Sequence, residues 1–439
     1  MICLKTKSIL MSGRRITMNE KKHPAKKSLA YKSVGIALSS ALLLSPLTTA
    51  AQELKSNSTS PASNTSSEGL TKLRSLSLIQ YKGSTLELGE HRLLSRKDIT
   101  QEWDDIDPDY SPEKSIEAVK ALLSEQNFEE LFPYRLGSKE WFKVAKGKEY
   151  FKEDQSDYFS YANLMQAVQE VSNLKIKIST RTGSPSSQEI VRLDKEAKVE
   201  TLILRSDDFN SDENKKKTLE TVIVDFGAFL KEGFKKDRKR ELAAFLANLS
   251  HETGGGWAGA PGGELKWGLF WNENIAGRTG VNMDAFVDPA SAKLFPGVSG
   301  QRYYGRGPIM LSWNFNYGLF SSIIYGDKNV LLQTPDQVAE DGKLGYMTAI
   351  LFWMTPQEPK PSAHDVMAGR WKPTSAEKEK GLIPGFGASI LVLNGLEAGL
   401  GEVEGSPVLR RAGHYRDITK RMGIDITGEK IDTLNMKPF

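Results

Sequence analysis

The feature that most restricts the fold of this 439-residue chain is the stretch RELAAFLANLSHETGGGW at residues 240–257. Its large apolar residues recur at the i, i+3, i+4 and i+7 positions of one helical face, namely Leu242, Phe245, Leu246 and Leu249. His251 and Glu252 fall on the last turn of this helix, and the three glycines that follow would let the backbone leave it with positive φ. The stretch therefore predicts a core helix that ends in an ionisable pair.

Glu252 has two interpretations. A carboxylate at a helix C-terminus faces the negative end of the helix dipole, and partial burial acts in the same direction, so both disfavour its charged form. A carboxyl group that keeps its proton near neutral pH is what a general acid requires. On these residues alone, the alternative is a surface carboxylate at an ordinary helix end.

The residues after Glu252 favour carbohydrate chemistry. Six of the eight tryptophans lie between residues 257 and 371, namely Trp257, Trp267, Trp271, Trp313, Trp353 and Trp371. Such clusters commonly form cores or interfaces, but aromatic rings beside carboxylates and amides also suit the faces of sugars. The segment GQRYYGRGPIMLSWNFNYG at 300–318, which includes Tyr303, adds hydrogen-bonding side chains among glycines that permit close backbone approach.

The rest of the chain has the pattern of a globular, helix-rich protein, with 39% hydrophobic and 26% charged residues. We expect helices over 111–126, where Ser111 is the cap, and over 161–171. Short strands are expected at 75–81, 84–89, 174–180 and 199–205. The charge run DENKKK at 212–217 predicts a solvated loop.

The N-terminus has the pattern of a targeting segment. Five lysines between residues 21 and 32 precede the apolar run 33–47, which is too short to span a bilayer comfortably, and small residues end at Ala51. We expect a secretory signal peptide and a protein exported to the extracellular space or periplasm, with an uncleaved membrane anchor as the alternative. Residues 1–51 hold nine Lys or Arg and one acid, so their removal changes the formal net charge from +4 to −4 and leaves no nucleic-acid footprint. The only cysteine, Cys3, leaves with them, so stability must come from a packed core.

We expect four parts along the chain. They are the signal peptide (1–51), a Ser/Thr-rich flexible linker (52–69), an N-terminal extension of unknown role (70–126) and one helix-rich domain (127–439). The extension is either a small accessory module or a segment packed on the main domain.

Several long blocks of the last part, in the same order, resemble the family 19 glycoside hydrolases, the chitinases of the lysozyme-like α-helical superfamily. The blocks are AAFLANLSHETGGGW, RYYGRGPIMLSWNFNYG, FWMTPQEPKPSAHDVMAGRW, IPGFGASILVLNG and RRAGHYRDI. The resemblance covers roughly 300 residues. It implies a mainly α, two-lobed lysozyme-like domain with a substrate cleft and a short N-terminal extension.

The resemblance implies a pair of catalytic carboxylates. Glu252 matches the family's general acid, and Glu273, in the loop KWGLFWNENIAG, matches the base that activates water. The family's base tends to lie one place later, where this chain has Asn274, and Glu264 is the fallback. Inverting enzymes keep such carboxyl groups about 6.5–9.5 Å apart to leave room for the water, which Ser312 would help to hold.

The resemblance also points to seven residues of the substrate site, namely His251, Trp267, Tyr303, Asn316, Lys360, Asn394 and Arg411. Glu397 matches an acid that pairs with the cleft arginine, in a block one residue shorter than usual, and a purely structural ion pair between Arg411 and Glu397 is the alternative. Two positions depart from the family, because Met310 replaces a glutamine and Phe315 a tyrosine. Losing an amide and a phenol removes hydrogen bonds worth on the order of 1 kcal/mol each, so an altered preference or rate is expected.

These observations predict a secreted, endo-acting hydrolase that cleaves β-1,4 bonds of chitin or chito-oligosaccharides with inversion. A peptidoglycan glycan-strand hydrolase and a non-catalytic carbohydrate-binding protein remain alternatives. No metal or organic cofactor is implied, because no His/Cys ligand spacing occurs and GRG is too short for a nucleotide loop. The expected partner is an N-acetylglucosamine polysaccharide, with no membrane after signal cleavage, and the expected state is a monomer.

Overall fold

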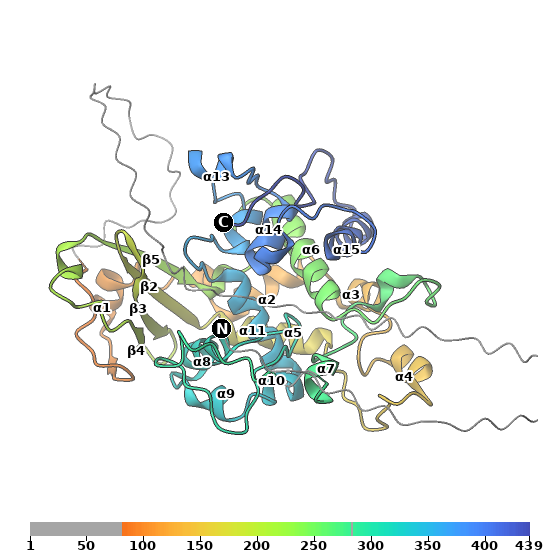
Figure 1. Ribbon diagram of the computed structural model, residues 1–439, viewed down its shortest axis with the longest axis horizontal. Coiled ribbons are helices and arrows are strands. Elements are labelled where there is room, and N and C mark those ends of the chain that lie inside the picture. The colour runs from red at the N-terminus through yellow and green to blue at the C-terminus, as the bar shows by residue number, and fades with distance from the viewer. Residues whose placement is uncertain (1–80, 282–283) are drawn as a thin grey trace, which may run out of the picture. The chain divides into compact units, whose positions relative to one another are not determined.

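The computed structural model describes residues 81–281 and 284–439 (Figure 1). Its strands are β1 (His91–Leu93), β2 (Leu174–Arg181), β3 (Ser184–Asp194), β4 (Val199–Arg205) and β5 (Leu219–Asp225). Its α-helices are α1 (Arg96–Glu102), α2 (Pro112–Lys120), α3 (Glu125–Leu131), α4 (Lys139–Ala145), α5 (Tyr161–Val171), α6 (Lys235–Glu252), α7 (Ile275–Arg278), α8 (Asn314–Tyr325), α9 (Asn329–Gln333), α10 (Gln337–Glu340), α11 (Gly342–Met354), α12 (Ala363–Met367), α13 (Ser375–Glu379), α14 (Phe386–Leu393) and α15 (Pro407–Arg421). Its 3₁₀ turns are η1 (Pro108–Tyr110), η2 (Asn214–Lys216), η3 (Phe226–Ala228), η4 (Glu264–Trp267) and η5 (Gly395–Glu397). The expected mainly helical fold class is confirmed.

The five strands form one antiparallel sheet in the order β1-β4-β3-β2-β5, and Figure 1 shows the arrows of β2 to β5 beside the helices. Strand β2 lies between β3 and β5, with Ile178 opposite Ile190 on one side and Val222 on the other. Every residue of β2 is buried, so both faces of the sheet are covered at this strand.

Each face of the sheet borders its own hydrophobic cluster. The larger cluster runs through the helices and includes Ile176, Ile178 and Leu204 from the sheet. The smaller cluster consists of Leu86, Leu94, Ile99, Trp103, Val191, Leu193 and Leu202. Alternate residues of a strand point to opposite faces, which is why neighbours such as Ile190 and Val191 enter different clusters.

Helix α6 forms where the apolar spacing predicted it and packs against α15. All residues from Glu241 to Glu252 are buried, so the helix is enclosed on every side rather than along one stripe. Helix α5 packs against α11 and is capped by Ser160, whose hydroxyl accepts a hydrogen bond from the Asn163 backbone N–H at 3.1 Å.

Most of the expected local structure is confirmed. Helix α2 begins at Pro112 after its Ser111 cap but ends at Lys120, and a separate helix, α3, begins at Glu125, so the single helix expected over 111–126 is two. Helix α5 matches the expected residues 161–171. Strands β2 and β4 cover the expected 174–180 and 199–205, and the charge run 212–217 is a largely exposed segment around the short turn η2.

The strand expected at 84–89 is wrong. Leu86 is buried but Leu88 is 48% exposed, and the Glu87 backbone N–H donates to the side chain of Glu90 instead of to a neighbouring strand. Regular pairing with β4 begins at His91, and just before it the Gly89 N–H donates to the Leu202 carbonyl at 2.8 Å. A strand needs a partner opposite it, and alternation of residues alone does not supply one.

Residues 81–126 are joined to the rest of the described chain. Strand β1 pairs with β4, and α2 packs against α5. The expected signal peptide, linker and first part of the extension, together with the strand at 75–80, lie outside the described residues. Within the part that is described, no helix is both long and apolar enough to cross a membrane.

Candidate functional site

Glu252 is the last residue of α6 and is 5% exposed. Its carboxylate Oε1 accepts a hydrogen bond from Arg411 Nη2 at 2.5 Å, within an ion pair. The ion pair places a fixed positive charge beside this carboxyl group. Glu252 is therefore a buried carboxyl group with a fixed cationic neighbour, which distinguishes it from an ordinary helix end.

Arg411, on α15, is fully buried and links three side chains. Its Nε donates to both oxygens of Glu397 at 3.1 and 2.9 Å, its Nη1 donates to Asn248 Oδ1 at 3.0 Å, and its Nη2 is shared by Glu397 and Glu252. Burial lowers the pKa of Arg411, but Glu397 and Glu252 outweigh burial and raise it above its ordinary value. The guanidinium is enclosed by protein groups, so Arg411 is a positioning residue rather than the substrate-binding residue that we expected.

Asn394 joins the same network. Its Nδ2 donates to Glu397 Oε1 at 3.0 Å, and its Oδ1 accepts from the Leu396 backbone N–H at 3.1 Å. The block that contains Glu397 is one residue shorter than is usual in the family. It folds as a 3₁₀ turn, which places the Glu397 carboxylate within hydrogen-bond distance of Arg411.

His251 is buried beside this network, in surroundings that disfavour its charged form. Burial lowers the pKa of His251 well below its ordinary value, and the positive charge of Arg411 lowers it further. Its Nδ1 has no hydrogen-bond partner among the described residues. A neutral imidazole here avoids adding a second cation next to Glu252.

The three glycines after α6 serve close approach, not the positive φ that we expected. None of Gly254, Gly255 and Gly256 has positive φ, and the helix ends at Thr253 with φ −108°. A Cβ at Gly255 would lie 2.5 Å from the Phe270 ring, and one at Gly256 would overlap the backbone of Glu264. The glycines thus let the chain after Glu252 lie directly against the loop at 264–270.

Backbone hydrogen bonds hold that loop to the end of α6. The Thr253 carbonyl accepts from the backbone N–H groups of Phe270 and Trp271 at 3.1 and 2.9 Å, and its hydroxyl accepts from Leu269 N–H at 2.9 Å. Glu273 follows on the same segment. The two predicted catalytic carboxylates are therefore carried by directly bonded segments.

Glu273 lies in a polar environment that the sequence did not specify. Its side chain is 15% exposed, its Oε2 accepts from the Tyr304 hydroxyl at 3.1 Å, and its Oε1 lies 3.5 Å from Arg278 Nη1. The fallback residue Glu264 is 40% exposed and lies 3.5 Å from Arg410. The more enclosed and better-oriented carboxylate is that of Glu273.

Ser312 and Asn316 lie next to the Glu273 segment. The Asn274 N–H donates to the Gly305 carbonyl at 2.8 Å, which joins this segment to the turn that precedes Ser312. Ser312 Oγ donates to the Met310 carbonyl at 3.0 Å, and Asn316 Nδ2 donates to the Ser312 carbonyl at 2.8 Å. Asn316 Oδ1 is buried without a partner among the described residues, so it remains an acceptor.

Two expected binding residues are core residues instead. Trp267 is buried, stacks on Tyr134 with ring centroids 4.5 Å apart, and donates its Nε1–H to the Pro261 carbonyl. Tyr303 is buried, and its hydroxyl donates to the Leu332 carbonyl at 2.8 Å while accepting from Val298 N–H. Their polar atoms are already satisfied inside the protein, so the expected contacts with a sugar are corrected to a structural role.

Lys360 lies apart from the Arg411 network in its contacts. Its Nζ donates to the Val392 carbonyl at 3.1 Å, and burial lowers the pKa of Lys360 to about 8. The family resemblance alone assigns it to substrate.

Asn248 and Tyr304 were missed in the sequence. Asn248 lies one turn before Glu252 on α6, so the i, i+4 spacing would have placed both side chains on one face. Tyr304 stands in the quoted block RYYGRG, but no local pattern distinguishes it from Tyr303, and the fold alone gives the two tyrosines different partners.

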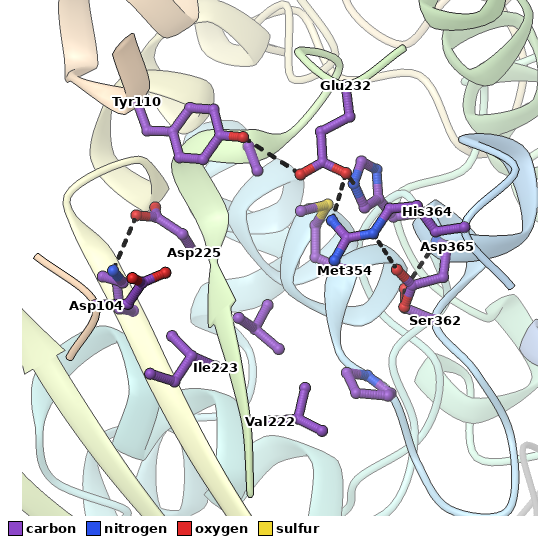
Figure 2. Close-up of a pocket in the computed structure, with 15 residues that line it drawn as sticks. Asp104, Tyr110, Val222, Ile223, Asp225, Glu232, Met354, Ser362, His364 and Asp365 are labelled. Carbon is purple, nitrogen blue, oxygen red and sulfur yellow. Dashed lines mark hydrogen bonds and ion pairs between the residues drawn. The ribbon is translucent and has the colours of Figure 1, made fainter. Parts of the chain in front are cut away.

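A second polar cluster holds the other end of α6, and Figure 2 shows Glu232 between the Tyr110 hydroxyl and the His364 ring. His364 Nδ1 lies 2.6 Å from Glu241 Oε1, and its Nε2 lies 3.3 Å from Glu232 Oε2. Arg370 also pairs with Glu232. Burial alone would lower the pKa of His364, but attraction to Glu241 and hydrogen bonds to both carboxylates raise it to about 10.

Across residues 81–281 and 284–439, no group of three or more His, Cys, Asp or Glu side chains could hold a metal ion.

The chain is similar in sequence to a known protein family and to several known proteins. The chitinase class I family of glycoside hydrolases, family 19, matches residues 200–433. The endochitinase A2 of Pisum sativum is 43% identical over 216 residues, which is 49% of this chain and 62% of the pea protein. The chitinase 1 of Oryza sativa is 42% identical over 49% of this chain and 63% of its own length, and an endochitinase of Carica papaya is 43% identical over 49% of this chain and 83% of its own length.

The chain thus spans less than two thirds of the length of the pea and rice relatives. The solved structure of chitinase C from Streptomyces griseus is 22% identical to it, with 71% of this chain and 97% of that one covered and a TM-score of 0.41. The family match extends over more than half of the chain and includes Glu252, Glu273, Ser312 and Arg411. The chain belongs to family 19 of the glycoside hydrolases.

Proposed function

We propose that this protein hydrolyses β-1,4 bonds between N-acetylglucosamine units of chitin, as an endo-acting enzyme. The observation that carries the proposal is the buried carboxyl group of Glu252, ion-paired to Arg411 and attached through Thr253 to the segment that bears Glu273. The names of the relatives, which are endochitinases, support the same substrate class.

In the proposed mechanism, protonated Glu252 donates its proton to the leaving glycosidic oxygen. Glu252 then becomes a carboxylate, and Arg411 Nη2 at 2.5 Å stabilises that charge as it develops. Glu397 takes two hydrogen bonds from Arg411 Nε, so part of the cationic charge beside Glu252 is already balanced.

Glu273 acts as the general base that removes a proton from the attacking water. The Tyr304 hydroxyl orients one of its carboxylate oxygens and leaves the other near Arg278. Ser312 and the free acceptor Oδ1 of Asn316 would hold water and an amide or hydroxyl of the sugar. Attack from the face opposite the leaving group inverts the anomeric carbon, so a β-linked substrate yields the α-anomer first.

The test uses Glu252→Gln, which keeps the shape of the side chain but removes the titratable proton. General acid catalysis supplies about 10²–10⁴-fold, so turnover of chito-oligosaccharides should fall at least a hundredfold, whereas the control Glu264→Gln should remain near wild type. Proton NMR of the first product should show the α-anomer. Retention of more than a tenth of wild-type turnover by the folded Glu252→Gln protein, or release of the β-anomer, would contradict the mechanism.

The same assays separate the alternative substrate. Met310 and Phe315 depart from the family beside Ser312, which is the observation that favours a glycan other than plain chitin, such as the glycan strand of peptidoglycan. Higher kcat/KM on purified cell walls than on colloidal chitin would assign that substrate. Binding without release of reducing ends would assign a carbohydrate-binding protein.

We further propose that the protein is exported and acts as a monomer after removal of residues 1–51. Support comes from the basic and apolar pattern of that segment and from the absence of cysteine in the rest of the chain. N-terminal sequencing of the protein recovered outside the cell should begin near Gln52, and recovery only in the membrane fraction would favour the uncleaved anchor.

A further inference from the structure

A pocket lies at the sheet, and none of the residues that line it is assigned to hydrolysis. It is formed where β2 and β5 meet the segment after β4, and its volume is about 690 Å³. Its lining residues are Tyr81, Lys82, Arg181, Asn210, Lys215 and Leu219. All of its charged side chains are cationic, and we call it the basic pocket.

Arg181 is the buried centre of the basic pocket. It is the last residue of β2, is 6% exposed, and lies with its guanidinium 4.7 Å from the centre of the Phe209 ring. Its Nε and Nη1 donate to the carbonyls of Phe209 and Lys217 at 3.3 and 3.5 Å. These contacts orient the side chain and leave Nη2 without a hydrogen-bond partner among the described residues.

No carboxylate balances this charge. Among the residues that the structure describes, Arg181, Lys82 and Lys215 form no ion pair. The nearby buried acid Glu189 is occupied, because it accepts from Tyr81, Ser84 and Arg205 at 3.0, 2.7 and 2.6 Å. A buried cation without a counter-charge is costly, and two exposed lysines at the same pocket add repulsion, so an anion bound here would stabilise the folded protein.

We propose that the basic pocket binds the phosphoryl group of inorganic phosphate or of a sugar phosphomonoester. Three cations with no lining acid favour a dianion over a singly charged carboxylate, since each attraction scales with the ligand charge. A guanidinium N–H directed at a phosphoryl oxygen makes a strong charge-assisted hydrogen bond, and the two lysines act as point charges. The pocket also has room for a sugar ring beside Tyr81 and Leu219.

Isothermal titration calorimetry on the full chain, in a buffer free of other anions, tests the proposal. The probes are inorganic phosphate, N-acetylglucosamine 6-phosphate and acetate at pH 7.5. We expect saturable binding of both phosphoryl probes, about tenfold or more tighter than acetate, and weakened by added salt. Tighter binding of the sugar phosphate would identify a phosphomonoester as the ligand, and equal binding would identify the free anion.

Lys82→Gln with Lys215→Gln is the decisive variant, because both side chains are exposed and their replacement leaves the core intact. Phosphate affinity should fall about tenfold, and Arg181→Gln should lower it further. The matched control is Lys235→Gln with Lys236→Gln, two exposed lysines outside the pocket. Unchanged glycan hydrolysis and melting temperature verify that each variant is folded.

Three outcomes would show that the basic pocket is not an anion site. They are the absence of saturable phosphate binding by the wild type, wild-type affinity in the Lys82/Lys215 variant, and an equal loss in the Lys235/Lys236 control. Acetate binding as tight as phosphate binding would refute the phosphoryl assignment. None of these outcomes depends on whether Glu252 is the catalytic acid.

Discussion

The ion-paired His364 should make a contribution to the stability of this protein that is lost as the pH rises through the alkaline range. Its ring lies between Glu241 at 2.6 Å and Glu232 at 3.3 Å. Burial alone would lower the pKa of His364, but these two carboxylates raise it to about 10. The same histidine in an unfolded chain has a pKa of about 6.5. A pKa that is raised on folding stabilises the folded state at pH values below the unfolded pKa, and this stabilisation is lost as the pH passes the folded pKa.

The magnitude follows from the size of the shift. Each unit of pKa difference corresponds to about 1.4 kcal/mol, so His364 contributes at most about 5 kcal/mol, which disappears between about pH 6.5 and pH 10. Glu232 does not titrate in this window, because burial raises its pKa but the hydrogen bond and charge of His364, together with Arg370, lower it to about 2. Lys177 and Lys360 do titrate there, since burial lowers the pKa of each to about 8, and their effect has the opposite sign.

The assay is urea unfolding of the wild type and His364→Gln at pH 6, 7, 8, 9 and 10. Glutamine retains a donor for Glu241 but carries no charge, and the lysines titrate alike in both proteins, so the difference in unfolding free energy isolates His364. The wild type should be several kcal/mol more stable at pH 6, and this advantage should shrink steadily toward pH 10. A difference that stays constant within about 0.5 kcal/mol would show that His364 is neutral when folded and would refute the reasoning.

Two further predictions concern the close contacts and the departures from the family. Gly255→Ala should lower the free energy of unfolding, measured in urea, by about 1–3 kcal/mol, because its Cβ would lie 2.5 Å from Phe270. The control is Gly413→Ala in α15, which should not destabilise the protein, because its Cβ would make only ordinary van der Waals contact with Leu265. Met310→Gln with Phe315→Tyr should raise kcat/KM on chito-oligosaccharides about tenfold, since two hydrogen-bonding groups return beside Ser312; unchanged kinetics on both chitin and cell walls would show that neither position affects the sugar or the water.

Local structure was largely readable from the sequence. The apolar spacing of α6 and α5 and the Ser111 cap reflect interactions within a few residues of the chain, so they do not depend on the rest of the fold. Alternation likewise identified β2 and β4, but it also suggested a strand at 84–89, where the structure has none.

The sequence by itself determined that a helix ends at Glu252, that glycines follow it, and that the blocks around it are those of a glycoside hydrolase family. Only the tertiary structure decided what surrounds that carboxyl group. Arg411 and Glu252 are 159 positions apart, and their ion pair exists because α6 and α15 pack together. Packing also places Trp267 and Tyr303 in the core, although aromatic side chains of these types suit a sugar-binding site equally well. Contacts between distant segments depend on how whole elements assemble, and no spacing along the chain encodes them.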